Sequence, residues 1–292
     1  MKFNAWLNKN NPFKLLLPII MIIMLFAGLI FITPSILQAS TSEGETVQLP
    51  ILMYHGVLKS SKSQGKYVIS SDDFEQDLKY ITENGYQTIL VSDLIRYVYE
   101  GAALPPKPIM ITFDDGYYNN YLYAYPLLQK YNCKMVISPI CKYTEEYSKT
   151  EDTNPNYAHV TWDNLNEMIA SGLVEVQNHS YNLHKTGKRL GTKKLNGESE
   201  EQYKKLLTDD VSKAQDAIYE KTGISPTAFT YPFGAVSKSS IPIIKEMGFK
   251  ATFYCENKTN HIGRNPEHLF GLCRYLRPGG VSSAQFFKEY KL

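Results

Sequence analysis

The sequence predicts an α/β fold, a distorted (β/α) barrel of about seven parallel strands with its active site at the strand C-terminal ends. Short apolar segments typical of strands alternate along the chain with segments typical of capped helices. Polar residues directly follow several of these strands: His55, Asp114-Asp115, Asn178-His179 and Tyr231-Pro232. Barrels of this class place their chemistry on that face. A doubly wound open sheet is the alternative that the pattern leaves open.

The first half of the chain supplies strands from its apolar runs, and two of its predicted helices begin at a capping serine, Ser71 or Ser92. Gly85 and Gly101 follow the first two predicted helices and mark their ends. In chain order we expect a strand over residues 49–54, a polar loop over 58–66, a helix over 71–83, a strand over 87–91, a helix over 92–101, a strand over 109–113, a helix over 118–131 and a strand over 135–140.

The second half follows the same alternation, with two longer polar segments between its elements. Thr161 is the predicted cap of one helix, and Gly172, Gly223 and Gly248 mark helix ends. In chain order we expect an exposed loop over residues 142–157, a helix over 161–172, a strand over 173–177, a basic loop over 185–197, a long helix over 198–221, a strand over 228–231, a helix over 241–247, and strands over 250–254 and 271–275.

The beginning of the chain resembles an export segment. Lys2, Lys9 and Lys14 precede an uncharged stretch over residues 15–38 that is rich in Leu, Ile, Met and Phe. The apolar stretch is long for a cleaved signal peptide and just long enough to span a bilayer. We therefore expect an exported protein, extracellular or at the cell surface. Whether the segment is removed or retained as a membrane anchor is left open.

We expect a three-part organisation, with a signal peptide or anchor over residues 1–40, a linker over 41–49 and one catalytic domain over 50–292. The formal net charge of +2 is too small to indicate a nucleic-acid partner, so none is expected. The cysteines form no C-x-x-C pair, which disfavours a zinc knuckle, and their disulfide state is left open. They are Cys133, Cys141, Cys255 and Cys273.

Two adjacent carboxylates, Asp114 and Asp115, end the apolar run over residues 109–113. An unpaired buried carboxylate is costly, so a strand that carries two acids to its end indicates a site rather than packing. His179 and His184 follow a later strand, and with Asp115 they provide the His₂Asp set of a catalytic zinc site. Their five-residue separation fits a loop, because on a helix the two rings would point well apart.

The two carboxylates should differ in role, because neighbours on an extended backbone point in different directions. One acid can bind the metal while the other acts on the attacking water as a general base. An Asp-Gly turn without chemistry would explain Asp115-Gly116, but not the second acid or the histidines. The residues therefore indicate a metal-dependent hydrolase.

These motifs resemble those of the polysaccharide deacetylases, the NodB-homology carbohydrate esterases. Residues 112–116, Thr-Phe-Asp-Asp-Gly, resemble the first motif of that family, and residues 179–184 resemble the second. The five-residue step between the histidines is similar to that of the bacterial poly-N-acetylglucosamine deacetylases. The resemblance extends over residues 50–292.

The resemblance implies a role for each motif residue. Asp114 would be the general base, and a divalent metal, most often Zn²⁺, would be bound by Asp115, His179 and His184. The family's C-terminal Leu-x-His motif, which supplies the general acid, is missing. Residues 51–55 look like that motif moved to the first strand, which makes His55 the candidate acid.

Residues 230–234 resemble the third motif, which forms one groove wall and offers a backbone N–H to the oxyanion. Thr230 stands where the family commonly has an arginine that orients the base, and Arg274 or Arg277 is the expected substitute. The residues assigned to substrate binding are Tyr231, Pro232, Phe233 and Arg274.

The implied reaction is removal of N-acetyl groups from a polymeric amino sugar. Poly-N-acetylglucosamine, peptidoglycan and chitin-like chains all remain candidate substrates. An O-acetyl esterase with the same ligands and a carbohydrate-binding module without turnover are the alternatives. A glycosidase with paired carboxylates fits the adjacent acids and the histidine pair less well.

Overall fold

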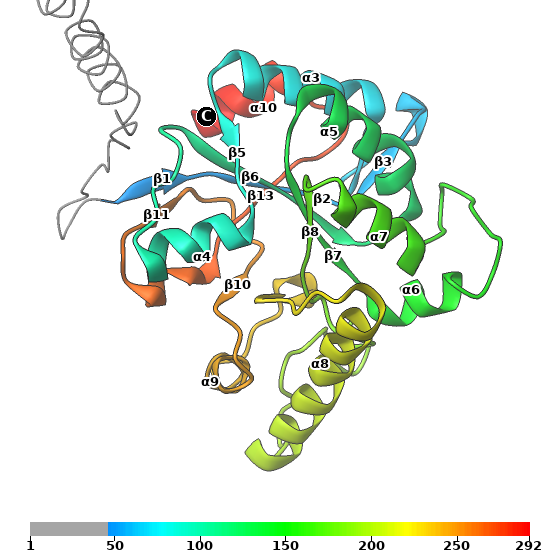
Figure 1. Ribbon diagram of the computed structural model, residues 1–292. Coiled ribbons are helices and arrows are strands. Elements are labelled where there is room, and N and C mark those ends of the chain that lie inside the picture. Colours follow the sequence, from blue (N-terminus) through cyan, green and yellow to red (C-terminus); the bar gives the residue numbers. More distant parts are fainter. Residues whose placement is uncertain (1–45) are drawn as a thin grey trace, which may run out of the picture. The chain divides into compact units, whose positions relative to one another are not determined.

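Two parallel β-sheets form the centre of the fold in the computed structural model, which describes residues 46–292 (Figure 1). One sheet has the order β13-β2-β6-β7-β8, with β5 paired to β6, and the other has the order β12-β10-β9. Every pairing within these sheets is parallel. The strands are β2 (Ile51–Tyr54), β5 (Gln87–Thr88), β6 (Pro108–Asp115), β7 (Met135–Pro139), β8 (Val174–Val176), β9 (Ala228–Thr230), β10 (Ala251–Phe253), β12 (Phe270–Leu272) and β13 (Tyr275–Leu276).

A bridge links the two sheets at one edge, and the chain itself connects them at the other. An isolated parallel bridge joins Asn178, after β8, to Phe229 of β9. At the other edge, residues 270–276 carry β12 and then β13, which pair with β10 and β2 respectively. The predicted α/β class with parallel sheets is therefore confirmed.

Short strands lie outside these sheets. β1 (Val47–Leu49) pairs antiparallel with β11 (Asn260–Ile262), and β3 (Gly56–Leu58) pairs with β4 (Val68–Ser70). The predicted polar loop over residues 58–66 is therefore partly wrong, because the segment starts in β3 and also contains the short helix η1 (Ser61–Ser63). Short paired segments of this kind are decided by their partner strand and not by local pattern.

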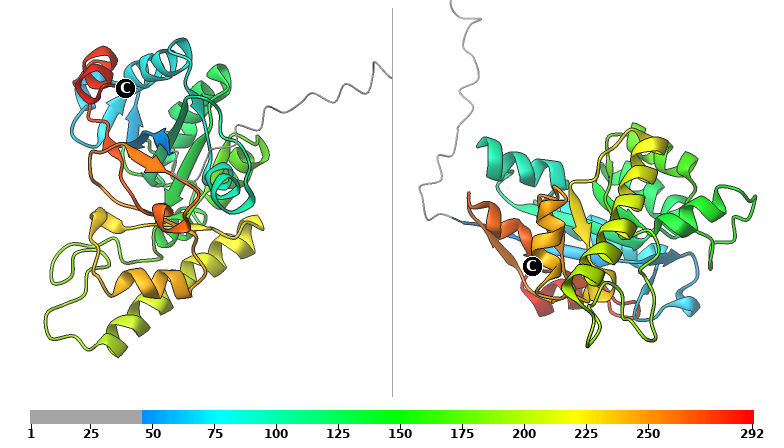
Figure 2. Two further views of the ribbon diagram at one scale, coloured as in Figure 1. Left: turned by 90° about the vertical axis from the view of Figure 1, so that its left-hand side faces the viewer. Right: turned by 90° about the horizontal axis from the view of Figure 1, so that it is seen from below.

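Helices lie outside the sheets (Figures 1 and 2). α3 packs against α5 and α10 on one side of the fold, while α8 packs against α7 and α9 on another. The α-helices are α3 (Ser71–Glu83), α4 (Val91–Glu100), α5 (Tyr125–Tyr131), α6 (Cys141–Tyr147), α7 (Trp162–Ala170), α8 (Glu200–Thr222), α9 (Ser240–Glu246) and α10 (Ser283–Tyr290). Shorter helical segments are η2 (Asn120–Ala124), η3 (Pro232–Gly234) and η4 (Pro266–Leu269).

Local sequence signals explain where the best-predicted helices begin and end. Ser199 caps α8 by accepting the N–H of Gln202, and Gly223 ends it in a left-handed conformation. Thr161 caps α7 in the same way, as predicted. The cap of α3 is Ser70, one residue before the predicted start.

Three predicted boundaries are wrong. Residues 142–157 are not entirely a loop, because α6 occupies Cys141–Tyr147 and buries Cys141 and Thr144. The strand expected over residues 87–91 is confined to β5, since α4 already begins at Val91. The helix expected over residues 118–131 starts as a π-helix, η2, before it continues as α5.

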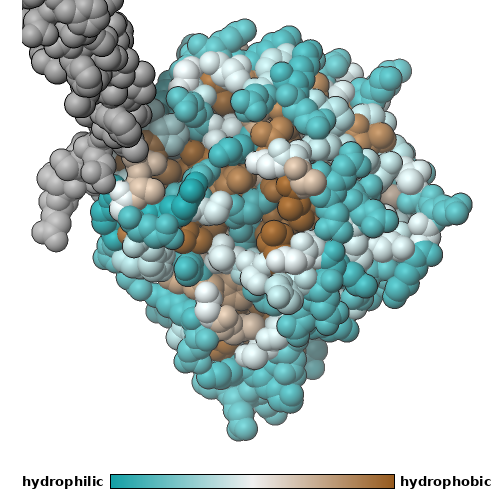
Figure 3. Space-filling view, in the orientation of Figure 1, coloured by the Kyte–Doolittle hydropathy of each residue, from teal (hydrophilic) through white to brown (hydrophobic). Residues whose placement is uncertain are grey.

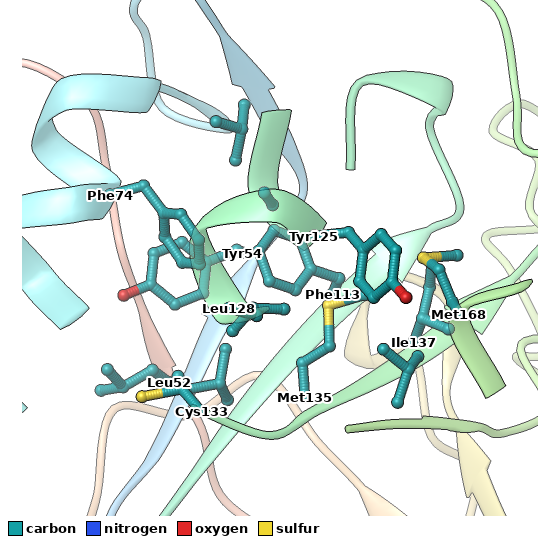
Figure 4. Packing of buried hydrophobic residues seen from close by; sticks show 14 of the residues in the cluster. Leu52, Tyr54, Phe74, Phe113, Tyr125, Leu128, Cys133, Met135, Ile137 and Met168 are labelled. Atoms are coloured by element: carbon teal, nitrogen blue, oxygen red, sulfur yellow. The ribbon is translucent and has the colours of Figure 1, made fainter. Parts of the chain in front are cut away.

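The largest apolar core lies between the sheet and the helices α3, α5 and α7. Its centre combines aromatic and aliphatic side chains from β2, β6 and β7 with those of the covering helices, as Figure 4 shows for Tyr54, Phe74, Phe113, Leu128 and Ile137. Tyr54 stacks on Phe113 at 5.1 Å between ring centroids. On the face seen in Figure 3, most of the surface is hydrophilic, and hydrophobic residues are visible mainly near its centre. This packing fixes the strand ends that carry the polar residues.

The predicted signal or anchor over residues 1–40 lies outside the described residues. Within residues 46–292, no helix combines the length and the apolar character that crossing a membrane requires.

Gly116, immediately after β6, should not tolerate a side chain. Its φ is 73°, and an added Cβ would lie 2.7 Å from Pro139 Cβ and 2.9 Å from Pro139 Cα. We expect Gly116→Ala to lower the free energy of unfolding by about 2–4 kcal/mol, because left-handed backbone strain and overpacking add. Gly172→Ala is the matched control, with a φ of 72° and no atom within 4 Å, and should lose only about 1–2 kcal/mol. Urea denaturation measures both, and equal losses would contradict the packing argument.

Candidate active site

A cavity of about 700 Å³ brings the predicted polar residues together at the C-terminal ends of the strands. Its lining includes His55, which follows β2, Asp114 and Asp115 at the end of β6, and His179 and His184 in the loop after β8. Parallel strands place their carboxyl ends on one side of a sheet, which is why residues so distant in sequence meet here.

Asp115, His179 and His184 converge as metal ligands would. Asp115 Oδ1 lies 3.5 Å from His179 Nε2 and 3.2 Å from His184 Nε2. Zinc–ligand bonds of about 2.0–2.2 Å place the atoms of a tetrahedral site about 3.3 Å apart, which matches both distances. Asp115 Oδ1 is also buried and accepts no hydrogen bond from the described residues.

The backbone selects the tautomer of His179 that a metal needs. His179 Nδ1 lies 2.8 Å from the carbonyl oxygen of Thr230, and a carbonyl can only accept, so Nδ1 carries the hydrogen. Nε2 therefore presents its lone pair to Asp115 and His184. Fixing a ligand histidine through its second nitrogen is the usual outer support of a metal site. The three residues fit a divalent metal ion.

The pKa values of these groups suit metal binding. Burial disfavours the charged form of Asp115, but His179 and His184 outweigh it and hold the pKa of Asp115 well below its usual range. Burial, together with the neighbouring His179, lowers the pKa of His184 to about 4. Burial also opposes protonation of His179, but Asp115 and Asp114 raise its pKa above the ordinary value. Of the two histidines, His179 is thus the one whose proton competes more strongly with a metal.

The backbone around Asp115 departs from the strand to aim the carboxylate. Asp115 has a φ of 70°, and Gly116 continues with a φ of 73°. The carbonyl oxygen of Asp115 accepts from the N–H of Ile140 at 3.2 Å and lies 3.1 Å from Nδ1 of His159. These contacts hold the left-handed conformation, which costs a non-glycine residue energy and is common at functional sites.

The loop that carries His179 and His184 is fixed by its neighbours. Asn178 donates to the carbonyl oxygen of Val211 at 3.1 Å and accepts from the N–H of Ser180 at 2.8 Å. The ring of His184 packs on that of Phe233, with 4.1 Å between centroids. The spacing of the two histidines therefore belongs to a structured loop, as predicted.

Asp114 is held by a buried arginine. Arg274 donates from both terminal nitrogens to the two carboxylate oxygens, at 2.7 and 2.8 Å, and the side chains are 0% and 3% exposed. Burial alone would raise the pKa of Asp114, but the charge of Arg274 lowers it below the ordinary value. Asp114 is therefore ionised at neutral pH, and it lies beside the candidate metal ligands Asp115, His179 and His184, called the metal-type residues below.

Arg274 is the arginine that pairs with Asp114, whereas Arg277 pairs with Asp77 at 2.8 Å. Thr230, at the position of the family's common arginine, exchanges a hydrogen bond with Ser138 at 2.8 Å. The sequence had left the choice between Arg274 and Arg277 open. The structure decides it, because both terminal nitrogens of Arg274 reach Asp114 while Arg277 is held by Asp77.

His55 also lines the cavity. Its ring packs against Tyr67, with 4.8 Å between centroids, and its carbonyl oxygen accepts from Asn120 at 2.6 Å. Burial lowers the pKa of His55, although the charges of Asp114 and Asp115 oppose this. The imidazole therefore lies in the site with a reduced tendency to hold a proton.

The residues assigned to substrate binding divide into two groups. Phe233 lines the cavity and is 41% exposed. Tyr231, Pro232 and Arg274 are buried and do not belong to the cavity wall. Tyr231 instead accepts a hydrogen bond from Ser240 at 3.1 Å, and Arg274 donates hydrogen bonds to Asp114. Their burial, which the motif could not reveal, separates these residues from the cavity.

Sequence reasoning missed much of the cavity wall. Additional lining residues are Met53, Lys66, Tyr67, Tyr117, Asn119, Asn156, Cys255, Asn257 and Leu276. Most of them follow strands or lie in loops, and only their position after an apolar run could have pointed to them. All four cysteines are free thiols, which answers the disulfide question left open by the sequence.

Comparison with known families now decides the assignment. The profile of the family described as polysaccharide deacetylase matches residues 101–252, which is more than half of the chain. This chain belongs to the polysaccharide deacetylase family. The resemblance seen in the sequence motifs is therefore confirmed.

Curated and solved relatives of this family member agree with that assignment. It is 23% identical to the poly-β-1,6-N-acetyl-D-glucosamine N-deacetylase of Escherichia coli (strain K12), covering 96% of this chain and 45% of that protein. The chain thus spans less than half the length of this relative. A de-N-acetylase from Aggregatibacter actinomycetemcomitans superimposes with a TM-score of 0.71 at 25% identity, covering 84% of this chain and all of that one. IcaB from Ammonifex degensii gives a TM-score of 0.68 at 26% identity, covering 85% and 97%.

We expect this deacetylase family member to bind a divalent metal, tested with zinc, more weakly as the pH falls through the raised pKa of His179. The pKa of His179 is raised, so a proton increasingly competes with the metal, and the Kd should rise about tenfold per pH unit below that pKa. Competition titration with a zinc indicator measures this. His184→Ala should lose most of the affinity, while the exposed His261→Ala serves as control. An affinity that declines only near pH 4, where His184 titrates, would contradict the assignment to His179.

We expect Arg274→Met to lower the free energy of unfolding at neutral pH by about 3–5 kcal/mol, because it leaves the Asp114 charge buried and unpaired. The folded-state pKa of Asp114 is depressed, so the pair stabilises the protein above the unfolded-state pKa and is lost as the pH falls through the folded-state pKa. The difference between wild type and variant should therefore shrink in acid. Denaturant unfolding across pH measures it. The double variant Asp114→Asn/Arg274→Met should be more stable than Arg274→Met alone, and the reverse order would contradict this account.

Proposed function

We propose that this protein removes N-acetyl groups from a polymeric amino sugar, with poly-β-1,6-N-acetylglucosamine as the foremost substrate. The observation that carries the proposal is the arrangement around one cavity of three metal-type residues, a base held by Arg274, and His55. Relatives named for this reaction support the choice of polymer. Peptidoglycan and chitin-like chains are the other polymers to compare.

Asp115, His179 and His184 would hold the metal ion, and zinc is the best match to two imidazole nitrogens and one carboxylate oxygen. When bound, such a metal acts as a Lewis acid that polarises the acetyl carbonyl and lowers the pKa of water. The left-handed backbone at Asp115 and the Thr230 carbonyl on His179 orient these ligands before any metal arrives.

The chain's own residues would move the protons. Asp114, ionised and pinned by Arg274, accepts a proton from the water that attacks the acetyl carbon. His55 donates a proton to the sugar nitrogen as the C–N bond breaks, so that acetate and a free amine leave. The backbone N–H of Phe233, at the cavity wall, is the proposed donor to the oxyanion.

The scaffold of the proposed enzyme is a distorted barrel. The bridge between Asn178 and Phe229, together with the double pairing of residues 270–276, supports a ring of about seven parallel strands. We also propose export to the cell surface or beyond, where such polymers lie, on the basis of the charge and apolar pattern of residues 1–40. That segment would either be cleaved or anchor the protein in the membrane.

We expect the purified, zinc-loaded protein to release acetate from β-1,6-linked N-acetylglucosamine oligomers. Asp114→Asn should lower kcat on the order of 10²-fold to 10⁴-fold, because the general base is lost while the metal ligands remain. Because burial lowers the pKa of His55, the decline of kcat/KM with rising pH should begin at a lower pH than for an exposed histidine acid. Enzymatic detection of acetate measures both effects, with chelation and zinc add-back as controls.

Substrate profiling separates the alternatives. Release from O-acetylated but not N-acetylated sugars would replace the proposal with an esterase. Tight zinc binding with oligomer binding but no acetate from any substrate would indicate a carbohydrate-binding protein. Unchanged activity of Asp114→Asn would remove the assigned base.

A further inference from the structure

We infer that Asn120, supported by Asn119, is a positioning residue for His55. The inference deepens the proposed function, because it rests on His55 acting as the general acid. The two asparagines directly follow the Asp-Asp-Gly-Tyr-Tyr segment at the end of β6. Their side chains act on the segment that carries His55 and not on the metal-type residues.

The side chain of Asn120 is hydrogen-bonded directly to the backbone of His55. Its Nδ2 donates to the carbonyl oxygen of His55 at 2.6 Å and to Oδ1 of Asn119 at 3.1 Å. Asn120 is fully buried, so solvent cannot compete for either bond. Loss of the side chain would leave the carbonyl of His55 without this donor.

Asn119 is hydrogen-bonded to the backbone of the same segment at Val57. Its Oδ1 accepts from the N–H of Val57 at 2.9 Å, and its Nδ2 donates to the carbonyl oxygen of Pro155 at 2.8 Å. Gly56 lies between His55 and Val57 and has no side chain to restrict its backbone. The two asparagines therefore hold His55 and Val57, the residues on either side of the adaptable Gly56.

The orientations of both amides are determined by their partners. Each Nδ2 faces only oxygen acceptors, so a flipped amide would set oxygen against oxygen. The arrangement leaves Oδ1 of Asn120 buried without a partner among the described residues. A buried unpaired oxygen costs stability. That the protein carries this cost at Asn120 indicates that the NH₂ group of the side chain is the part that is needed.

The helix geometry at this point supports the same reading. Asn120 begins the π-helix η2, which precedes α5. π-helical turns are rare and occur frequently at functional sites. Asn119 also lines the cavity, so the pair joins the cavity wall to the His55 segment.

A double-mutant cycle on the full-length, zinc-loaded protein tests the inference. Asn120→Ala should lower kcat by about tenfold or more with little change in KM, because displacing a catalytic group by about 1 Å can cost on the order of 10²-fold. In the His55→Gln background the same substitution should cost less than about twofold, since the residue acts through His55. Equal losses in both backgrounds would overturn the inference.

A control variant at an exposed site tests whether loss of an amide hydrogen bond away from the cavity also lowers kcat. Asn166→Ala also removes an amide that donates to a backbone carbonyl, that of Lys221 at 3.1 Å, but away from the cavity, and should leave kcat unchanged. If Asn120→Ala does not fold, Asn120→Ser takes its place in the cycle. A kcat for Asn166→Ala that falls as far as that of Asn120→Ala would overturn the inference.

A second readout does not depend on turnover. In ¹³C-histidine-labelled, zinc-loaded protein, the ring signal of His55, assigned with His55→Gln, should shift in Asn120→Ala while that of His159 stays in place. An unchanged His55 signal would overturn the positioning role. If wild type releases no acetate from any sugar, the proposed function fails, and the ring signal alone decides whether Asn120 positions His55.

Discussion

The bidentate contact between Arg274 and Asp114 is the constraint on which the site depends. It ties the end of β6 to the segment between β12 and β13, which lies far away in sequence, and Arg274 also donates to the carbonyl oxygen of Tyr254 at 2.9 Å. A buried ion pair adds little net stability compared with an apolar alternative, yet loss of either partner is costly. The main effect of the pair is therefore to position the Asp114 carboxylate, and its effect on overall stability is smaller. The strands must keep their register for the pair to form.

Two adjacent acids acquire different environments because the backbone changes between them. Asp114 remains in the extended strand and meets Arg274, whereas Asp115 turns into the left-handed region and faces His179 and His184. Alternation along a strand would by itself send the two side chains to opposite faces of the sheet. The left-handed turn, with no room for a side chain at Gly116, brings both carboxylates to the same cavity instead. Local strain is thus part of how the site is built.

Apart from Arg274, the outer contacts described for the site come from backbone and amide groups. The Thr230 carbonyl orients His179, Asn178 shapes its loop, and the asparagines 119 and 120 hold the segment of His55. Neutral groups of this kind orient catalytic side chains without introducing charges that would shift their pKa values strongly. This matters in a cavity that already contains two carboxylates and three histidines.

The sequence by itself determined the features that depend on neighbours in the chain. Helix caps, closing glycines and apolar runs located α7 and α8 and the strand that ends in the acids, and the motif residues indicated the metal-type set before any contact was known. The short helix α6 in a polar segment escaped prediction, because only two of its residues are buried and packing decides it. The choice of Arg274 over Arg277, the burial of Tyr231, and the contact of Asn120 with His55 were decided by tertiary structure alone. Each depends on hydrogen bonds and packing between segments that lie apart in the chain, and a local pattern does not encode which segments meet.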